Sequence, residues 1–252
     1  MTWGTAAFAG KFPGSPKLWS MTPRTHWTAE LRALPRPRWP RYLDEHSGLP
    51  GPRANTELAL AFGALADPAD IDRVIDSPDE YRAMCAAVAL GARATDTAPR
   101  ARAHSSARDP RWRVREGVVL GLQLLADSDI GTVQKLVTRW ARDPDPLVVR
   151  AAVAAICEPR LLGTPAAAAC AIDTCTAATA VVSGWPAEAR RDPALRTLRQ
   201  ALGYCWSVAV AAAPEAGLPV FSSLDDTDPD VSWVIQQNMK KKRFMRILAA
   251  GG

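Results

Sequence analysis

This sequence has few histidines and no nucleotide-binding glycine motif, and both features limit the catalytic chemistry that the protein can perform. Its 252 residues include three histidines, His26, His46 and His104, and none belongs to a recognisable catalytic or metal-binding constellation. There is no phosphate-cradling glycine loop and no dinucleotide fingerprint. Acidic pairs such as Asp225-Asp226 lie in expected capping turns, which gives them no acid–base role. We therefore expect no metal and no cofactor, and we favour a role without catalysis.

The cysteines are few and odd in number, which argues against a disulfide framework. They lie in apolar segments that are expected to be helical, at Cys85, Cys157, Cys170, Cys175 and Cys205. Cys170 and Cys175 are five residues apart, with no second pair and no nearby histidine, so this spacing does not predict a zinc site. Free, buried thiols in a reducing cytoplasm are the expectation.

Long apolar runs and a secretory signal are also missing from the pattern. The most apolar stretch, residues 166–182, is interrupted by Asp173 and several threonines, so we expect no membrane span and no membrane partner. The first twenty residues are rich in glycine and proline and lack an apolar signal core. We expect a cytoplasmic protein with a flexible leader over residues 1–26. Met21 offers an alternative start, which would leave residues 1–20 outside the native chain.

The charge that is present is mildly basic and partly local. The formal net charge is +5, and much of the excess lies in one run, Lys240-Lys241-Lys242-Arg243. This run has two interpretations. It is a contact for phosphate or another acidic surface, or it is a solvated end of a helix, where lysines complement the negative end of the helix dipole and form a polar cap.

A short pattern recurs along the chain and predicts the fold. An apolar residue followed by arginine opens a helical run just after an Asp-Pro or Pro-Asp step, at Tyr81-Arg82, Val114-Arg115, Val149-Arg150 and Leu198-Arg199, and a fifth copy at Val231 has serine in place of arginine. Successive copies begin 33, 35, 49 and 33 residues apart. Self-similarity at this period is typical of stacked helical pairs. The 49-residue interval indicates an insertion before Pro193.

The Asp-Pro steps set the expected helix starts, because aspartate accepts free N–H groups there and proline fits the first turn. We expect all-α structure, with a proline-rich segment over residues 27–55 that leads into repeats over residues 56–252. Residues 94–108, which are small and polar, are expected to form a loop. The expected helices span residues 40–45, 56–66, 69–76, 79–93, 111–126, 130–141, 147–157, 165–182, 193–212, 218–224 and 230–248.

The segment from Asp109-Pro110 to Val114-Arg115 resembles the entrance to the second helix of a HEAT repeat, and the resemblance extends over about residues 56–248. The chain is also similar to a poorly characterised bacterial subgroup of HEAT-repeat proteins. This similarity lies in four stretches, residues 47–55, 157–162, 202–207 and 238–243. The resemblance implies an armadillo-type fold, an all-α right-handed superhelix (α-solenoid) of about five to six helical pairs. It implies no single activity.

Four arginines, Arg82, Arg115, Arg150 and Arg199, occupy the same position in successive repeats. They form a ladder that is open to two interpretations. A functional ladder would contact phosphates along a nucleic-acid backbone. A structural ladder would bond the aspartate or the carbonyl groups of the turns between repeats, to which the planar guanidinium is well suited. We favour the structural role, in which these arginines brace one repeat against the next.

A more distant resemblance points to the DNA-alkylation-repeat glycosylases, HEAT-like enzymes that hold damaged DNA with tryptophans, an acidic residue and an arginine. Trp112 and Glu116 lie four residues apart on one helix face, and Arg150 begins the corresponding helix of the next repeat. The trio departs from that family because the acid is glutamate and the tryptophan-rich stretch around it is missing. For the tryptophans of the repeats, core packing is favoured over base stacking: Trp112, Trp140, Trp185, Trp206 and Trp233.

The sequence thus favours a non-enzymatic scaffold for protein–protein interaction or possible DNA binding. Its concave surface would receive an unidentified protein partner or a nucleic acid. The alternative is a DNA-repair or resistance protein of the glycosylase type, with Trp112 and Glu116 at the lesion and Arg150 on a phosphate. The sequence specifies neither the identity of a partner nor an oligomeric state.

Overall fold

The computed structural model describes residues 23–250, and every regular element in that range is helical. The all-α class is therefore confirmed. Three short 3-10 helices, η1 (Arg36–Arg38), η2 (Pro159–Leu161) and η3 (Ala187–Ala189), lie between the longer elements. The α-helices are α1 (Pro23–Ala33), α2 (Trp39–Glu45), α3 (Thr56–Leu65), α4 (Pro68–Asp72), α5 (Glu80–Ala92), α6 (Thr97–Ser106), α7 (Trp112–Trp140), α8 (Pro146–Ile156), α9 (Pro165–Ser183), α10 (Pro193–Ala212), α11 (Pro214–Ser222), α12 (Pro229–Met239) and α13 (Lys242–Ala250).

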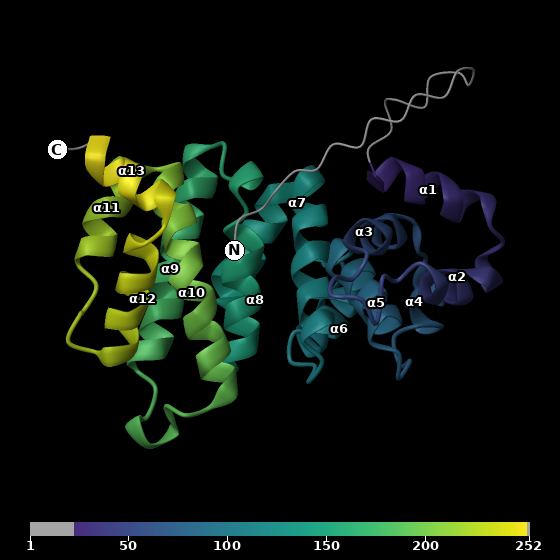
Figure 1. Ribbon diagram of the computed structural model, residues 1–252, viewed down its shortest axis with the longest axis horizontal. Coiled ribbons are helices and arrows are strands. Elements are labelled where there is room, and N and C mark those ends of the chain that lie inside the picture. The colour runs from purple at the N-terminus through teal and green to yellow at the C-terminus, as the bar shows by residue number, and fades with distance from the viewer. Residues whose placement is uncertain (1–22, 251–252) are drawn as a thin grey trace.

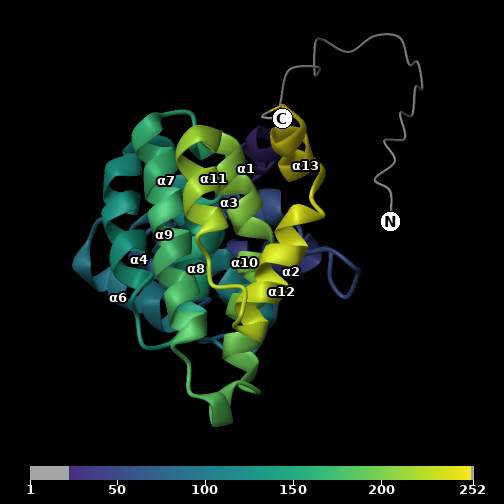
Figure 2. The same cartoon turned by 90° about the vertical axis from the view of Figure 1, so that its left-hand side faces the viewer.

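The helices follow one another in chain order along the long axis of the molecule, from α1 at one end to α12 and α13 at the other (Figure 1). Contacts between helices run in series: α3 packs on α5, α5 on α7, α7 on α8, α8 on α10, and α10 on α12. Figure 2 looks onto the C-terminal end, where α9, α10 and α12 lie against one another. Each helix therefore buries its apolar side mainly against its neighbours along this series.

Aspartates cap the helix starts, as the Asp-Pro steps predicted. The carboxylate of Asp67 accepts from the N–H of Asp70, and that of Asp145 accepts from the N–H of Leu147 at 2.9 Å. Asp192 caps α10 in the same way, and Asp228 accepts two N–H groups at the start of α12. A proline follows each of these aspartates in the first helical turn, where its missing N–H removes no bond.

The described residues begin inside a helix. Pro23 is the first residue of α1, so the last residues of the expected leader already belong to a helix, and residues 1–22 lie outside the described range. The helix expected over residues 40–45 is found as α2, and the start of α3 is capped by Asn55, whose Oδ1 accepts from the N–H of Leu58. The segment between them is a turn-rich loop, as predicted.

Two expectations about local structure are wrong. Residues 94–108 were expected to be a loop but contain the helix α6, in which Ala103 is completely buried. Alanine favours helix, and its small side chain lets α6 approach α5 and α7 closely. The single helix expected over residues 230–248 is two helices, α12 and α13. It breaks after Met239, where the N–H of Lys241 bonds the carbonyl of Asn238 three residues back instead of continuing the i−4 pattern.

Helix α7 unites two helices that the sequence predicts separately. Its 29 residues contain one non-helical residue, Asp129, with φ −145° and ψ 72°. The carboxylate of Asp129 accepts a hydrogen bond of 2.9 Å from the N–H of Thr132 and so caps the second half. The two expected helices are therefore real, and they meet at a kink rather than across a loop.

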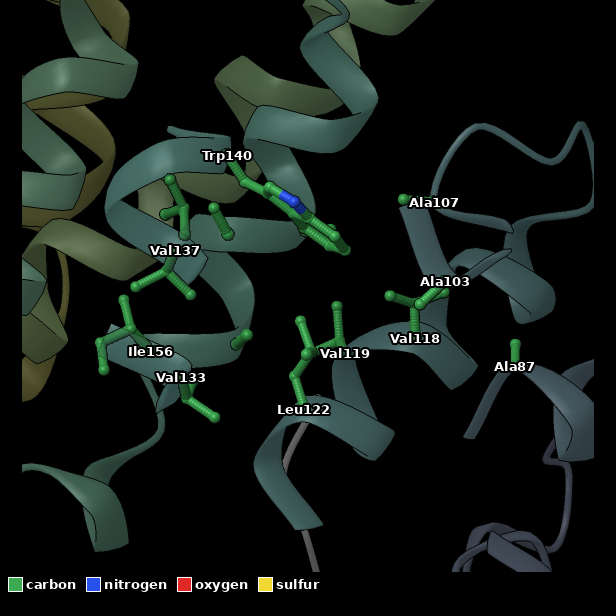
Figure 3. Packing of buried hydrophobic residues seen from close by; sticks show 14 of the residues in the cluster. Ala87, Ala103, Ala107, Val118, Val119, Leu122, Val133, Val137, Trp140 and Ile156 are labelled. Carbon is green, nitrogen blue, oxygen red and sulfur yellow. The ribbon is translucent and has the colours of Figure 1, made fainter. Parts of the chain in front are cut away.

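The buried apolar side chains form one cluster that runs through the molecule. Figure 3 shows its middle part, where Val133 and Val137 from the second half of α7 lie near Ile156 of α8, and Val118 from the first half lies near Ala103 of α6. Trp140 is 3% exposed and Trp206 is completely buried. Core packing therefore accounts for these two tryptophans.

Helices α5 and α7 approach each other through glycines. A methyl group added to Gly121 of α7 would lie 2.8 Å from the Cα of Gly91 in α5 and closer still to the carbonyl oxygen of Val88. A methyl group on Gly117 would lie 2.5 Å from the carbonyl oxygen of Met84. The two backbones are in direct contact because neither helix has a side chain at these positions.

Helix α9 bears on the expectation that no segment spans a membrane, and that expectation stays a prediction. Among the described residues it is the one helix that meets the criteria of length and composition for crossing a membrane. Half of its most apolar window is buried inside the protein. It packs against α7, α8, α10, α11 and α12, as the central helix of a packed domain does.

Candidate functional site

An arginine-lined cavity opens at the start of α10. Its volume is about 350 Å³. It is bounded by the end of η3, the first two turns of α10 and the start of α12, and the residues that line it are Arg190, Arg191, Leu195, Arg196, Arg199 and Asp230. We call it the arginine cavity. Four cationic side chains on one small cavity are unusual, because like charges at short range repel one another unless an anion lies between them.

Two of these arginines are held in place by aspartates of α12. Arg190 donates to the carboxylate of Asp228 at 2.6 Å and to that of Asp230 at 3.1 Å. Arg199 donates to the other oxygen of Asp230, and its guanidinium lies 4.7 Å from the ring centre of Trp233. Hydrogen bonding from Arg190 lowers the pKa of Asp228 from its ordinary value. These contacts fix the orientation of both guanidinium groups, and they leave the Nε of Arg199 buried without a hydrogen-bond partner.

The other two arginines, Arg191 and Arg196, are exposed, and neither side chain has a hydrogen-bond or ion-pair partner among residues 23–250. Their donors are available to a ligand. The sequence-based interpretation missed both residues, together with Arg190 and Asp230. The sequence did contain a signal for this site, the close spacing of four arginines around Pro193. It was passed over because the excess positive charge of the chain was attributed mainly to the run Lys240–Arg243.

The second feature is an exposed aromatic ring with two cations close to it. Tyr204 of α10 is 44% exposed. The Nζ of Lys241 lies 5.7 Å from the centre of its ring, and the guanidinium of Arg243 lies 4.9 Å from it. Arg243 also donates to the hydroxyl of Tyr204 at 2.7 Å. The predicted basic run therefore lies at the junction of α12 and α13, beside an aromatic side chain that the sequence-based interpretation did not select.

Helix α10 joins these two features. Arg196, Gln200 and Tyr204 are all exposed and lie four residues apart, so they share one face of the helix. The rise of 1.5 Å per residue places the backbone of Tyr204 roughly 12 Å beyond that of Arg196. This face, with Lys241 and Arg243 at its far end, is called the basic strip below.

The remaining predicted basic residues, Lys240 and Lys242, lie at the same junction. Both side chains are exposed. The exposed ring and the neighbouring cations together make a surface that is suited to a partner with flat rings and negative charges.

The four aligned arginines do not share one kind of partner. Arg82 bonds Asp44 of α2, with Nε 2.6 Å from Oδ1, and Arg199 pairs with Asp230. Arg115 donates to the carbonyls of the turn before its own helix, with the nearer oxygen at 2.7 Å. Arg150 has no ion pair within residues 23–250, and its Nη1 is buried without a hydrogen-bond partner. Three of the four thus make local contacts with aspartates or turn carbonyls.

The trio suggested by the glycosylase resemblance is partly assembled. Trp112 is 52% exposed, and the guanidinium of Arg113 lies 4.6 Å from its ring centre. Burial lowers the pKa of Arg150, and the nearby charge of Glu116 acts in the opposite direction. Glu116 and Arg150 lie on α7 and α8, two helices that pack together, without an ion pair between them in the described residues, and Trp112 lies one turn before Glu116 on the same helix.

The cysteines are free and mostly buried. The sulfurs of Cys157 and Cys175 are 3.6 Å apart in the core, and burial raises the pKa of Cys175 and of Cys85. Within the described part of the chain, no group of three or more His, Cys, Asp or Glu side chains is arranged to hold a metal ion.

Comparisons of the chain with protein-family models, with curated proteins and with solved structures give no match. The resemblance to HEAT-repeat proteins therefore rests on the sequence motifs, and a function has to be argued from the geometry of the site.

Proposed function

We propose that this protein is a non-enzymatic, cytoplasmic scaffold of the HEAT-repeat kind that binds a nucleic acid through the basic strip on α10 and α13. The observation that carries the proposal is the exposed ring of Tyr204 with Lys241 and Arg243 close to it. An aromatic ring of this kind offers a base a stacking surface, and the cations offer contacts to the adjacent phosphates.

The arrangement of the helices supports the scaffold part of the proposal. The serial packing of α3, α5, α7, α8, α10 and α12 is what stacked helical pairs produce, and each helix in the series contacts its neighbours along the chain. A stack of this kind presents one long surface to a partner. Its free thiols are compatible with a reducing cytoplasm.

Binding is tested with a fluorescently labelled single-stranded oligonucleotide, by anisotropy at low and moderate salt. We expect salt-dependent binding that the variant Tyr204→Ala weakens by roughly 5- to 150-fold, because base stacking contributes about 1–3 kcal/mol per base. Tyr204 is exposed, so its removal leaves the core intact. The matched control is Trp112→Ala, which removes another exposed aromatic ring outside the basic strip. Absence of binding at low salt, or equal loss in both variants, would sink the proposal.

An acidic protein surface is the competing partner for the same cations. Affinity purification of the tagged protein, with and without nuclease, separates the two. Nuclease-sensitive recovery of nucleic acid is the expected result. A partner that survives nuclease and whose capture depends on Lys241 and Arg243, but not on the ring of Tyr204, would favour the protein instead.

The second candidate function is DNA repair of the alkylation-repeat glycosylase type, and one observation favours it. The exposed Trp112 lies one turn from Glu116, whose charge acts on the buried guanidinium of Arg150. Its test is release of a modified base from alkylated DNA, followed by chromatography. Base release that Glu116→Gln abolishes would support it. DNA left intact by the wild-type protein would contradict it.

A further inference from the structure

The arginine cavity has the size and the charge of a site for one compact anion. Its volume of about 350 Å³ is at the small end of the range for ligand sites, which is about 300–1,000 Å³. Four arginines line it with one aspartate, Asp230, and two further aspartates lie beside it: Asp228, which pairs with Arg190, and Asp192, which caps α10. Positive charge remains in excess. The planar donor fork of arginine fits the oxygens of a phosphate group.

The donors in the cavity fall into a fixed pair and a free pair. Arg190 and Arg199 are held by Asp228 and Asp230, so their side chains are already ordered and a ligand would not have to order them. The carboxylate of Asp230 lines the cavity and would repel an anion, but each of its oxygens already accepts a hydrogen bond from one of these two arginines. Arg191 and Arg196 are left to bind the ligand.

We propose that the arginine cavity binds the terminal phosphate of a nucleic-acid strand. A phosphate monoester at a strand end carries a charge of about −1.5 to −2 at neutral pH, and the cavity has positive charge in excess to attract it. A phosphodiester inside a strand carries one charge and continues in both directions, so it fits a recess less well than an open groove. Tyr204, roughly 12 Å further along α10, stacks on a base a few nucleotides from that end.

This inference rests on the proposed function, because it names the part of the nucleic acid that the site selects. It also makes a prediction that general binding to the basic strip does not make. A surface that reads only the phosphate backbone binds a strand equally well with or without a terminal phosphate, apart from the small effect of added charge.

The experiment compares three oligonucleotides of one sequence, carrying a 5′-phosphate, a 3′-phosphate or hydroxyls at both ends, by anisotropy with the full chain. We expect one phosphorylated end to bind about tenfold more tightly than the hydroxyl-ended strand. This ratio corresponds to about 1.4 kcal/mol, close to the lower end of the range for a hydrogen bond to a charged group. The double variant Arg191→Ala/Arg196→Ala should reduce this ratio to near one.

Both replaced side chains are exposed and without partners, so the variant is expected to fold normally. The control Arg32→Ala/Arg139→Ala removes the same charge from two exposed positions on α1 and α7 and should keep the ratio. Equal affinity of all three oligonucleotides for the wild-type protein would overturn the inference. So would an unchanged ratio in Arg191→Ala/Arg196→Ala.

Inorganic phosphate and pyrophosphate, measured by calorimetry, separate this inference from the proposed function. Binding of either anion that depends on Arg191 and Arg196, without binding of any oligonucleotide, supports the cavity as a phosphate site and contradicts nucleic-acid binding. Binding of all oligonucleotides alike, without binding of either anion, supports the proposed function and overturns the cavity as a phosphate site.

Discussion

Replacing Gly121 by alanine tests the contact between α5 and α7. The added methyl group would lie 2.8 Å from the Cα of Gly91 and 3.0 Å from the backbone nitrogen of Ala92, and it would overlap the carbonyl oxygen of Val88. These neighbours are backbone atoms on a neighbouring helix, so they cannot move away as a flexible side chain does. Ordinary contact between carbon atoms begins at about 3.5 Å, so the two helices have to separate.

The expected magnitude follows from two opposing effects. Forcing an extra methyl group into a well-packed contact costs about 1–3 kcal/mol, and backbone neighbours place this site at the upper end. Alanine in place of glycine inside a helix returns about 1 kcal/mol. The net loss of unfolding free energy is therefore about 2 kcal/mol, and it lowers Tm by roughly 4–8 °C in a protein of this size.

Urea unfolding followed by circular dichroism measures this loss, with Gly131→Ala as the matched control. Gly131 lies in the same helix, but a methyl group there meets only the Oδ1 of Asp129, at 3.6 Å. That variant should gain up to about 1 kcal/mol from helix propensity alone. The two substitutions are chemically identical and are expected to have opposite signs. A Gly121→Ala protein as stable as the wild type would refute the close packing of α5 on α7.

Three further predictions follow from individual contacts. Asn238→Ala should lower the unfolding free energy in urea by about 2–3 kcal/mol, because the completely buried amide bridges the N–H of Ser207 and carbonyls of α10 and α12. Arg190 lowers the pKa of Asp228 in the folded protein, so the ionised carboxylate stabilises the fold above the ordinary aspartate pKa, and this stabilisation is lost as the pH falls through the lowered pKa. Asp228→Asn should therefore reduce the decrease in unfolding free energy that is measured between pH 7 and pH 3. A thiol reagent should label Cys170, the partly exposed cysteine, before unfolding, and the other cysteines only after unfolding, as mass spectrometry of the labelled peptides would show.

The helix starts were predictable because their signals are local. An aspartate followed by proline marks the first turn through its own hydrogen bonds, and the bounds of α10, residues 193–212, follow directly from Asp192-Pro193. The expected helices over residues 111–126 and 130–141 left a gap that contains Asp129, but the sequence predicted no kink within one continuous helix. Helix α6 was not predicted, because its small and polar residues lack an apolar periodicity and its stability comes from packing against α5 and α7.

The candidate site was less predictable because it is assembled across helices. The sequence singled out Arg199 and the lysine run, but it did not show that the start of α12 returns to the start of α10 and brings Asp228 to Arg190. The exposure of Tyr204 likewise depends on where α12 ends and α13 turns away. The spacing of the arginines around Pro193 can be read from the sequence. The sequence does not show that the start of α12, about 30 residues later, packs against them and completes the cavity.

The most direct test of nucleic-acid binding is the salt dependence of affinity for a single-stranded oligonucleotide, measured for the wild-type protein and for the triple variant Arg196→Ala/Lys241→Ala/Arg243→Ala. The logarithm of the association constant should fall linearly with the logarithm of salt concentration. Because each phosphate contact on a single strand contributes about 0.7 to the slope, loss of three cations should make the slope shallower by about 2. A slope that is the same in both proteins, or an affinity that does not change with salt, would contradict the basic strip as the binding surface.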